Sequence, residues 1–330
     1  MTLGVFDVID QMTGYQTAAT LTAAARLGVF DLLADQSLTW EQTAADLATD
    51  PLATRALLDA LVGLELVVLD ADSRYQAAPV ATRLGGGGDL RLIAEKEAFF
   101  AKVWLDLESS IRSGRPHLSP WHSRLRTDPA QARQFLEALV VLARETGPDL
   151  AALAGIGPET RVADLGGGLG SYAIPLAMAG ADVTLVDLPL VAAWAAEVVA
   201  DAAPEVAERI AVLSVDLLAE GSATAVGSGF DVVLLSHLLH DLTDADARTV
   251  LGAAFSIARP DGTVVVFELP GDPPGAFGPT FDLMMRVETP GAARRVQELA
   301  DLMVGAGLTD VAEVPGANRP HGVLAGRVPA

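Results

Sequence analysis

The amino-acid sequence predicts an α/β protein in which a helical, winged-helix-like module precedes a Rossmann-like, largely parallel sheet. From about residue 159 onward, strand-like apolar runs alternate with helical stretches, a pattern typical of a sheet with helices on both faces. The first 85 residues instead predict helices followed by a short hairpin, and the glycine run 85–88 marks a linker. The predicted segments are 1–88, a helical linker region over 89–155, and the sheet domain over 156–330.

The N-terminal module is predicted from capping and turn signals. Together they give the helix, helix, hairpin outline of a winged helix. In chain order the signals are a helical pattern over 17–34 broken at Gly28, a capping box of Thr39 and Gln42 that begins a helix to Leu47, an Asp50–Pro51 start of a helix to about Leu64, and strand-like runs at 67–70 and 74–78.

Many winged helices bind DNA, so the charge of the second helix is informative. The would-be recognition helix, 51–66, carries one arginine, Arg55, against Asp59 and Glu65. Phosphate contacts need several cations, because counterion release supplies most of the affinity. We therefore interpret this module as a packing or dimerisation unit.

Composition restricts the partners further. Asp and Glu number 43 against 22 Lys and Arg, a formal net charge of −21, and so acidic a surface repels nucleic acid and anionic lipids. The absence of cysteine excludes disulfides, thiolate metal sites and cysteine catalysis. No apolar run approaches the roughly 18 residues needed to cross a bilayer, and no secretory signal is evident. We expect a cytoplasmic protein with neither nucleic-acid nor membrane partners.

Beyond the glycine run the chain is first helical and then alternating. The helical pattern of 89–155 is interrupted by a polar break at 113–129, which contains His117, Trp121 and His122. The strand-like runs that follow are TRVADL, DVTLVD, RIAVLSVD, FDVVLLS and GTVVVFE, and then TDVAEVPG and HGVLAGRV, which we expect to close one edge of the sheet.

A glycine-rich turn, DLGGGLG at 164–170, follows the first of these runs. Glycines at a strand-to-helix turn allow a ligand to approach the backbone closely. The dinucleotide fingerprint needs a glycine at position 171, where this chain has Ser171. Asp164 at the strand end disfavours a pyrophosphate and favours a cationic ligand, such as the ammonium and sulfonium of S-adenosylmethionine.

Two further acids end the next two strand-like runs. Asp187 follows the second run, where a carboxylate can accept hydrogen bonds from both ribose hydroxyls. Asp216 ends the third run, close enough to reach an adenine amino group. Three acids at the ends of three successive strands are a stronger signal for a nucleoside ligand than the glycine turn alone.

The sequence resembles the two-domain, S-adenosylmethionine-dependent small-molecule O-methyltransferases of the plant caffeic acid and bacterial polyketide type. The matching stretches span nearly the whole chain in order, and they are ARLGVFDLL, ADLGGGLG, TLVDLP, SVDLL, LLHDLTD, RPDGTVVVFE and LMVGAGL. The resemblance implies a seven-stranded class I methyltransferase domain, preceded by a helical domain that forms a homodimer by exchange. It also implies a small-molecule substrate, with 89–155 contributing to its pocket. The cofactor-binding residues that we expect are Asp164, Gly166, Gly168, Asp187, Leu188, Asp216, Leu217 and Ser236.

The resemblance also assigns the chemistry. Methyl transfer to a hydroxyl requires removal of its proton, and histidine has a pKa suited to that task. In this family the histidine of a His-Asp pair is the general base and a glutamate 28 residues later assists it, which places these roles on His240 and Glu268. Asp241 is expected to raise the basicity of His240 or to cap the turn.

Three positions depart from the family pattern. The family's second supporting glutamate aligns with Arg294, which could instead pair with a carboxylate substrate. The usual tryptophan after His-Asp is Leu242, and the usual cofactor-contacting lysine is Ser236. Relatives line the acceptor pocket in regions that here contain Trp121, Phe135, Met284 and Met285.

Other functions remain open from sequence. Some relatives methylate the carbon beside a keto group with metal help, and His237, His240 and Asp241 offer ligands at short spacing. Positions 237 and 240 flank a strand-to-turn transition, so their spacing alone does not bring the side chains together, although Glu268 or Glu288 could supply a distant third ligand. We predict no metal and interpret His237 as a packed residue. The remaining alternatives are a relative that keeps the cofactor without methylating and a non-enzymatic cofactor sensor, against which the His240 and Glu268 pair argues.

Overall fold

The computed structural model describes residues 3–272, 277–317 and 320–330. The chain divides into two compact units, Met1–Lys102 and Val103–Ala330. Each unit has a hydrophobic core of its own. We call them unit 1 and unit 2.

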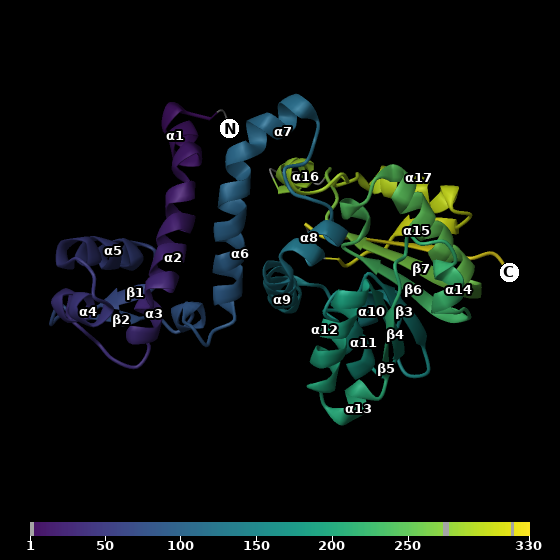
Figure 1. The fold of residues 1–330 in the computed structure, drawn as a ribbon, viewed down its shortest axis with the longest axis horizontal. Helices are drawn as coiled ribbons and strands as arrows, with labels where there is room; N and C mark the ends of the chain where they lie inside the picture. Colours follow the sequence, from purple (N-terminus) through teal and green to yellow (C-terminus); the bar gives the residue numbers. More distant parts are fainter. Residues whose placement is uncertain (1–2, 273–276, 318–319) are drawn as a thin grey trace. The chain divides into compact units, whose positions relative to one another are not determined.

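Unit 1 is a helical body with a two-stranded hairpin (Figure 1). Its described elements are α1 (Val5–Thr13), α2 (Tyr15–Leu27), α3 (Val29–Leu32), α4 (Trp40–Leu47), α5 (Pro51–Gly63), β1 (Val67–Leu69), β2 (Tyr75–Ala77), the 3₁₀ turn η1 (Ala81–Leu84) and α6 (Leu90–Val103), which ends at the unit boundary.

The predicted capping signals of unit 1 are confirmed. Gly28 has a φ of +80°, a left-handed conformation that suits glycine and ends α2 where the helical pattern breaks. The side chains of Thr39 and Gln42 form the reciprocal capping box at the start of α4. The Asp50 carboxylate accepts the backbone N–H of Ala53 at 2.9 Å and begins α5. The hairpin also forms where predicted.

Helix α1 lies before the first helix that the sequence pattern predicts. None of its residues is buried within the chain, although the helix is rich in apolar side chains. Phe6 is 83% exposed, Val5 75% and Met12 73%. An apolar helix surface left this open is a surface that a partner can cover.

Unit 2 is built on a seven-stranded mixed sheet of order β5-β4-β3-β6-β7-β9-β8. The first five strands of this sheet along the chain, β3 to β7, pair in parallel. Strand β9 pairs antiparallel with both β7 and β8, and the last two strands along the chain, β8 and β9, close one edge of the sheet, as the sequence predicts. The strands are β3 (Arg161–Leu165), β4 (Asp182–Asp187), β5 (Ile210–Ser214), β6 (Phe230–Ser236), β7 (Ala258–Glu268), β8 (Thr309–Glu313) and β9 (Gly322–Arg327).

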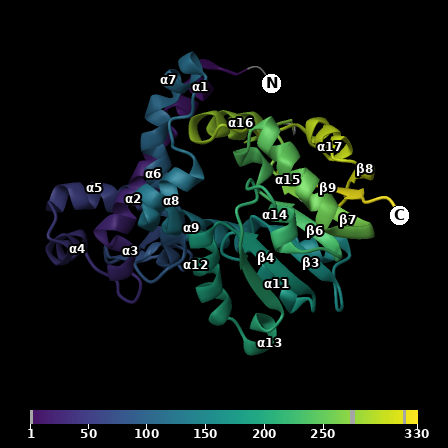
Figure 2. The same ribbon diagram turned by 45° about the vertical axis from the view of Figure 1, so that its right-hand side comes forward.

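Helices cover both faces of this sheet (Figures 1 and 2). Helices α11 and α12 pack on β4 and β5, whereas α15 and α17 pack on the opposite layer beside β6 to β9. The helices of unit 2 are α7 (Leu107–Ser113), α8 (Trp121–Thr127), α9 (Pro129–Thr146), α10 (Leu150–Ala154), α11 (Ala173–Met178), α12 (Pro189–Ala200), α13 (Pro204–Ala207), α14 (Ser222–Val226), α15 (Asp244–Ile257), α16 (Phe277–Glu288) and α17 (Val296–Gly305), with 3₁₀ turns η2 (Trp104–Asp106) and η3 (Leu239–Asp241).

The continuous apolar runs of the central strands follow from this layering. Successive side chains of a strand point to opposite faces, and both faces are covered here. In β6, Val232 and Leu234 therefore pack in the core with α11 and α12, while Val233 and Leu235 pack with α15 and α17.

Two details of the prediction are wrong. The polar segment 113–129 is not only a break, because it contains helix α8. The third strand ends at Ser214 rather than at Asp216, which lies in the following turn. Apolar periodicity detects neither a short polar helix of seven residues nor the exact end of a strand.

Candidate active site

The glycine turn after β3 exposes backbone to a ligand. Gly166 and Gly168 have φ angles of +72° and +56°, which L side chains rarely adopt. A Cβ on Gly166 would press on the Leu238 side chain at 2.9 Å, whereas one on Gly168 would meet nothing within 4 Å. The chain therefore packs tightly on one side of the turn and leaves the other side open.

Asp164 and Asp187 stand beside this turn at the carboxyl ends of β3 and β4. Asp164 is completely buried, and its carboxylate makes no well-formed hydrogen bond within the described residues. Burial and the neighbouring charge of Asp187 raise the pKa of Asp164 to about 7. Burial likewise raises the pKa of Asp187 to about 6, partly opposed by the backbone N–H groups of Gly168 and Leu188, which donate to its oxygens at 2.8 and 2.7 Å.

Asp164, buried and without a compensating cation among the described residues, favours a positively charged ligand nearby, because a cation would stabilise its ionised form. An ammonium or sulfonium group fits this requirement, and a pyrophosphate does not. The observed donors and acceptors therefore match the S-adenosylmethionine expected from the sequence.

The remaining expected cofactor residues differ in their exposure. Asp216 is partly exposed, accepts the backbone N–H of Leu218 at 3.0 Å and lies 2.9 Å from Nε2 of His122 on α8. The Leu217 side chain packs in the core with α15, Ser236 is buried at the end of β6, and Leu188 packs in a small cluster with Leu169 and Trp194. The approach of α8 to Asp216 is a contact that sequence reasoning missed.

His240 and Glu268 form a buried pair at the same edge of the sheet. Nδ1 of His240, in η3, lies 2.5 Å from Oε2 of Glu268 at the end of β7. Oε1 of Glu268 accepts the backbone N–H groups of Leu239 and His240 at 2.8 and 3.2 Å, which holds the carboxylate toward the ring. The predicted pairing of these two residues is therefore present in the structure.

The pair shifts the proton affinity of both groups. Burial alone would lower the pKa of His240, but the charge and the hydrogen bond of Glu268 outweigh it and raise that pKa to about 9. Burial pushes the pKa of Glu268 upward, but the positive charge of His240 and the shared hydrogen bond hold it below the usual value. The proton is therefore held firmly between them in the folded chain.

Asp241 helps to raise the pKa of His240 through its charge, as expected, although the Glu268 carboxylate contributes more. Oδ2 of Asp241 accepts the indole N–H of Trp121 at 3.1 Å, and burial raises the pKa of this carboxyl. Trp121 in turn lies 5.5 Å from Phe135 between ring centroids, with the buried guanidinium of Arg124 4.2 Å from the centre of the indole ring. Helix α8 thus brings one of the expected pocket residues, Trp121, against the His-Asp turn, and α9 brings another, Phe135, against Trp121. Arg124 on α8, which the sequence did not indicate, joins them.

The expected Met284 and Met285 lie on α16 in a small apolar cluster with Phe281. Phe281 is the contact to the base, since its ring meets that of His240 edge-on at 5.2 Å between centroids. Met285 is almost fully buried and Met284 only partly. The methionines therefore pack in one cluster with Phe281, an aromatic residue that was not among the predicted pocket residues.

The suggested pairing of Arg294 with a substrate carboxylate is wrong for this structure. Its buried guanidinium donates to the backbone oxygens of Leu239 and Leu242 and to Oδ1 of Asp244. These partners lie on either side of His240 in the chain. Arg294 therefore holds the turn that carries the base, and its donors are used within the protein.

The side chains of His237 and His240 converge in the structure, although their spacing alone does not require it. The ligand atoms of His237, His240 and Glu268 all lie within 4.8 Å of one another. Backbone pairing explains this, because Ser236 pairs with Phe267 across β6 and β7, so the residues that follow, His237 and Glu268, are neighbours. Spacing along the chain did not reveal this proximity.

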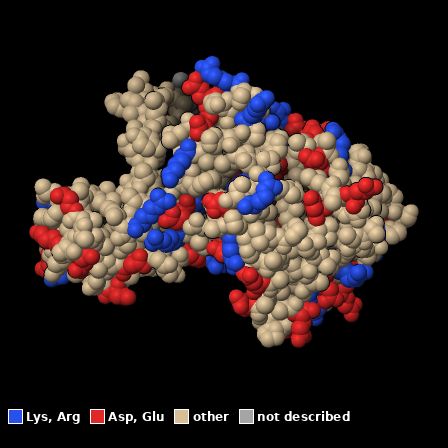
Figure 3. Space-filling model, viewed as in Figure 1, with Lys and Arg blue, Asp and Glu red and all other residues tan. Residues whose placement is uncertain are grey.

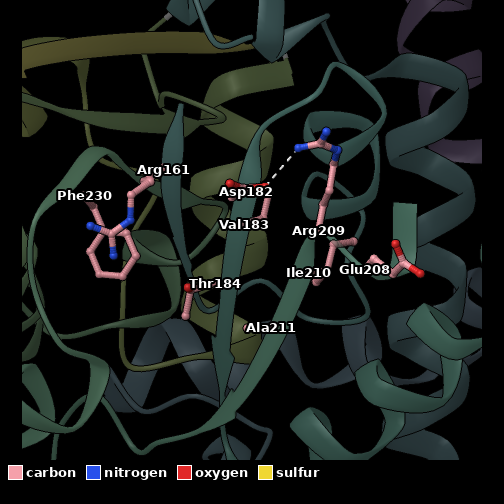
Figure 4. Close-up of a pocket in the computed structure, with 9 residues that line it drawn as sticks. All are labelled: Arg161, Asp182, Val183, Thr184, Glu208, Arg209, Ile210, Ala211 and Phe230. Atoms are coloured by element: carbon pink, nitrogen blue, oxygen red, sulfur yellow. Dashed lines mark hydrogen bonds and ion pairs between the residues drawn. The ribbon is translucent and has the colours of Figure 1, made fainter. Parts of the chain in front are cut away.

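A hollow lies at the end of the sheet formed by the amino ends of the strands, opposite the end that carries the glycine turn (Figure 4). Arg209 there donates to Oδ1 of Asp182 at 3.0 Å, and the Arg161 guanidinium stacks on the Phe230 ring. Arg161 also donates to the backbone oxygen of Gly229 at 2.9 Å. These groups hold one another, and the hollow contains neither the glycine turn nor the His240–Glu268 pair.

The chain matches two known family models. A model described as the O-methyltransferase domain matches residues 104–309, and one described as the O-methyltransferase dimerisation domain matches residues 9–85. The chain therefore belongs to the family of O-methyltransferases with an N-terminal dimerisation domain.

Individual relatives agree with this assignment. The chain is 30% identical to a 3-hydroxy-5-methyl-1-naphthoate 3-O-methyltransferase of Streptomyces sahachiroi, over 96% of this chain and 93% of that protein. It is 29% identical to the N,N-dimethyltransferase OxyT of Streptomyces rimosus, over 81% and 78% respectively. The fold matches human N-acetylserotonin methyltransferase in complex with SAM, with a TM-score of 0.83, 22% identity and coverage of 98% and 97%.

The protein is a methyltransferase that uses S-adenosylmethionine and acts on small molecules, as the sequence predicts. In the part of the chain that the structure describes, no helix is both long enough and apolar enough to cross a membrane. On the face drawn in Figure 3, acidic and basic side chains are interspersed.

Proposed function

We propose that this protein transfers a methyl group from S-adenosylmethionine to a hydroxyl group of a small secondary metabolite, with His240 as the general base. The single observation that carries the proposal is the buried His240–Glu268 pair at the carboxyl edge of the sheet. A base is needed when the acceptor must lose a proton, whereas positioning suffices for an amine that already has a free lone pair. The pair therefore favours hydroxyl over nitrogen acceptors.

The orientation of the imidazole supports this role. Glu268 engages Nδ1, so Nε2 is the ring nitrogen left to accept a proton from the substrate. When Nε2 takes that proton the ring becomes cationic, and the Glu268 carboxylate stabilises the charge. Phe281 packs against the ring and limits the directions from which water reaches it.

The cofactor residues are proposed on the same basis. S-adenosylmethionine supplies an electrophilic methyl group on a sulfonium centre, which the acceptor oxygen displaces in line. Asp164 and the glycine turn favour the cationic amino-acid end of the cofactor, and Asp187 offers acceptors to the ribose hydroxyls. Asp216 is proposed to contact the adenine.

Unit 1 is proposed to form a homodimer. Its dimerisation-domain match and the exposed apolar side chains of α1 support this, because burying such side chains yields roughly 1.5–3 kcal/mol each. We further propose that residues 89–155 contribute to the acceptor pocket through Trp121 and Phe135, and that the protein acts in the cytoplasm. The domain boundaries 1–88, 89–155 and 156–330 stay predictions.

The test combines cofactor binding with turnover. We expect S-adenosylhomocysteine to bind wild-type protein in the micromolar range by calorimetry, with or without prior chelation. His240→Ala should keep that affinity within about threefold and lose methyl transfer to phenolic acceptors by roughly 10²–10⁴-fold. Full turnover by His240→Ala on a hydroxyl acceptor would contradict the proposal, and methylation confined to amines would favour the N-methylating relatives instead.

A further inference from the structure

Three potential ligands for a metal ion meet beside the proposed base. His237 follows β6, His240 lies in η3 and Glu268 ends β7, and their ligand atoms lie within 4.8 Å of one another. The backbone N–H of His237 donates to the carbonyl of Phe267 at 2.8 Å, which continues the β6–β7 ladder by one residue. The sheet therefore positions His237 and Glu268, and the turn that follows β6 positions His240.

The residues around the cluster orient its members. Oε1 of Glu268 is occupied by two backbone N–H groups, so Oε2 is the oxygen that faces the histidines. The His237 ring packs edge-on against Phe267 at 4.4 Å between centroids. Outer contacts of this kind raise metal affinity, because they fix the direction of each ligand before an ion arrives.

The backbone of His237 is held in an unusual conformation. Its φ of +51° lies in the left-handed region, which is unfavourable for a residue other than glycine. Strained residues of this kind persist where the surrounding structure overrides the cost, and they are common at functional sites. Here the strain directs a second imidazole toward the His240–Glu268 pair.

The donor set suits a borderline transition metal rather than magnesium. Two imidazole nitrogens and one carboxylate oxygen are ligands that zinc prefers, at about 2.0–2.1 Å, and three protein ligands leave an open coordination position. The cluster must adjust by roughly 1 Å to reach those distances. Asp241 is excluded from the set because its Oδ2 accepts the Trp121 indole N–H.

We propose that His237, His240 and Glu268 form a binding site for a divalent transition metal of the zinc type, and that the bound ion inhibits methyl transfer. On binding, the ion replaces the proton held between His240 and Glu268, which leaves to solvent. With the ion on Nδ1, the ring keeps its remaining proton on Nε2, so that Nε2 cannot accept the proton of the substrate. The inhibition rests on the proposed function of His240, whereas the binding does not.

Zinc chloride titrated by calorimetry into chelator-treated, full-length protein tests the binding. We expect one zinc ion per chain in the micromolar range and at least tenfold weaker binding by His237→Asn, because asparagine tolerates the left-handed backbone but its amide is a poor zinc ligand. Glu268→Gln should weaken binding similarly. His117→Asn is the matched control, since His117 is exposed and pairs with Asp106, and it should bind zinc as wild type does.

Turnover tests the inhibition separately. Zinc should inhibit wild type and His117→Asn equally, and His237→Asn should need at least tenfold more zinc for the same inhibition. Absence of zinc binding by wild type, or equal binding by folded His237→Asn with intact S-adenosylhomocysteine binding, overturns the site. Activation by zinc overturns the inhibitory role. If no hydroxyl acceptor is methylated at all, the proposed function fails while the calorimetry still decides the metal site.

Discussion

The acidic residues at the amino ends of β4 and β6 (the amino edge of the unit 2 sheet) are paired with cations, whereas, among the described residues, those at the carboxyl ends of β3 and β4 near the glycine turn (the carboxyl edge) are not. At the amino edge, Asp182 pairs with Arg209, and the pKa of Asp231 lies below its usual value because the Arg161 backbone amide and Arg259 bind it. At the carboxyl edge, burial raises the pKa of both Asp164 and Asp187. Compensated charges stabilise a fold, whereas uncompensated buried ones mark a place where a ligand is to complete the site.

The largest difference between the two edges is expected in cofactor affinity, when the acidic residues at the two ends of β4 are replaced in turn. Asp187→Ala, at the carboxyl end of β4, should weaken S-adenosylhomocysteine binding roughly 10- to 100-fold, because acceptors for the ribose hydroxyls are lost. Asp182→Ala, at the amino end of the same strand, is the matched control and should change affinity less than twofold. Calorimetric titration of both variants measures the difference. Equal losses would mean that the two edges do not differ as described.

A smaller effect is expected from the clamp on the base-bearing turn. Arg294→Met leaves buried carbonyl oxygens of Leu239 and Leu242 without their donor and should lower the free energy of unfolding by about 2–4 kcal/mol. Because the turn loses its position, kcat should also fall about tenfold with little change in KM. Arg294→Lys should recover part of both, and the exposed Arg286→Met should affect neither. Denaturant unfolding and steady-state kinetics measure these changes; a loss of stability without any change in kcat would leave Arg294 only structural.

The third prediction concerns pH. His240 with a pKa of about 9 is largely protonated at pH 7.5, so kcat/KM of the wild type should rise with pH toward that value. Glu268→Gln removes the carboxylate charge but not the burial, so the His240 pKa should fall and the acid limb of the profile should move to lower pH, with a reduced maximum. If the acid limb of the profile stays at the same pH in Glu268→Gln, that limb reports the titration of a group other than His240.

The His240–Glu268 pair also predicts how stability depends on pH: stability should fall as the pH rises, whereas kcat/KM should increase. A histidine whose pKa is raised by folding stabilises the fold fully below its unfolded value of about 6.5 and loses that contribution as the pH rises through 9. The melting temperature of wild type should therefore fall between pH 7 and pH 10 by more than that of Glu268→Gln. Thermal unfolding of both proteins across this range checks it.

The smallest effect is expected at the amino edge. Arg209→Met removes an exposed ion pair to Asp182, and such pairs contribute about 0–1 kcal/mol. Its kcat, KM and cofactor affinity should match wild type within twofold. A large loss of activity would show that the hollow in Figure 4 takes part in function after all.

Much of the fold could be predicted because a strand that is buried on both faces has a recognisable run of apolar residues in the sequence. Each central strand of unit 2 needs mostly apolar residues at consecutive positions, so β6 and β7 stood out by the runs VVLL and VVVF, and β3 and β4 by runs that only Asp164 and Thr184 interrupt. Helix α8 was missed because its seven residues are mostly polar and follow Pro120. Helix α1 was missed although its apolar residues Val5, Val8, Ile9 and Met12 recur at helical spacing in the sequence.

Local sequence alone determined the capping boxes, the glycine turn and the acids that end β3 and β4, because each depends on residues only a few positions apart. Likeness to a family added His240 and Glu268. Only the tertiary structure decided that His237 joins that pair, that Arg294 holds the turn and that Trp121 binds Asp241. These contacts depend on strand register and on side-chain directions between residues far apart in the chain, such as the 120 positions from Trp121 to Asp241, which spacing along a sequence does not encode.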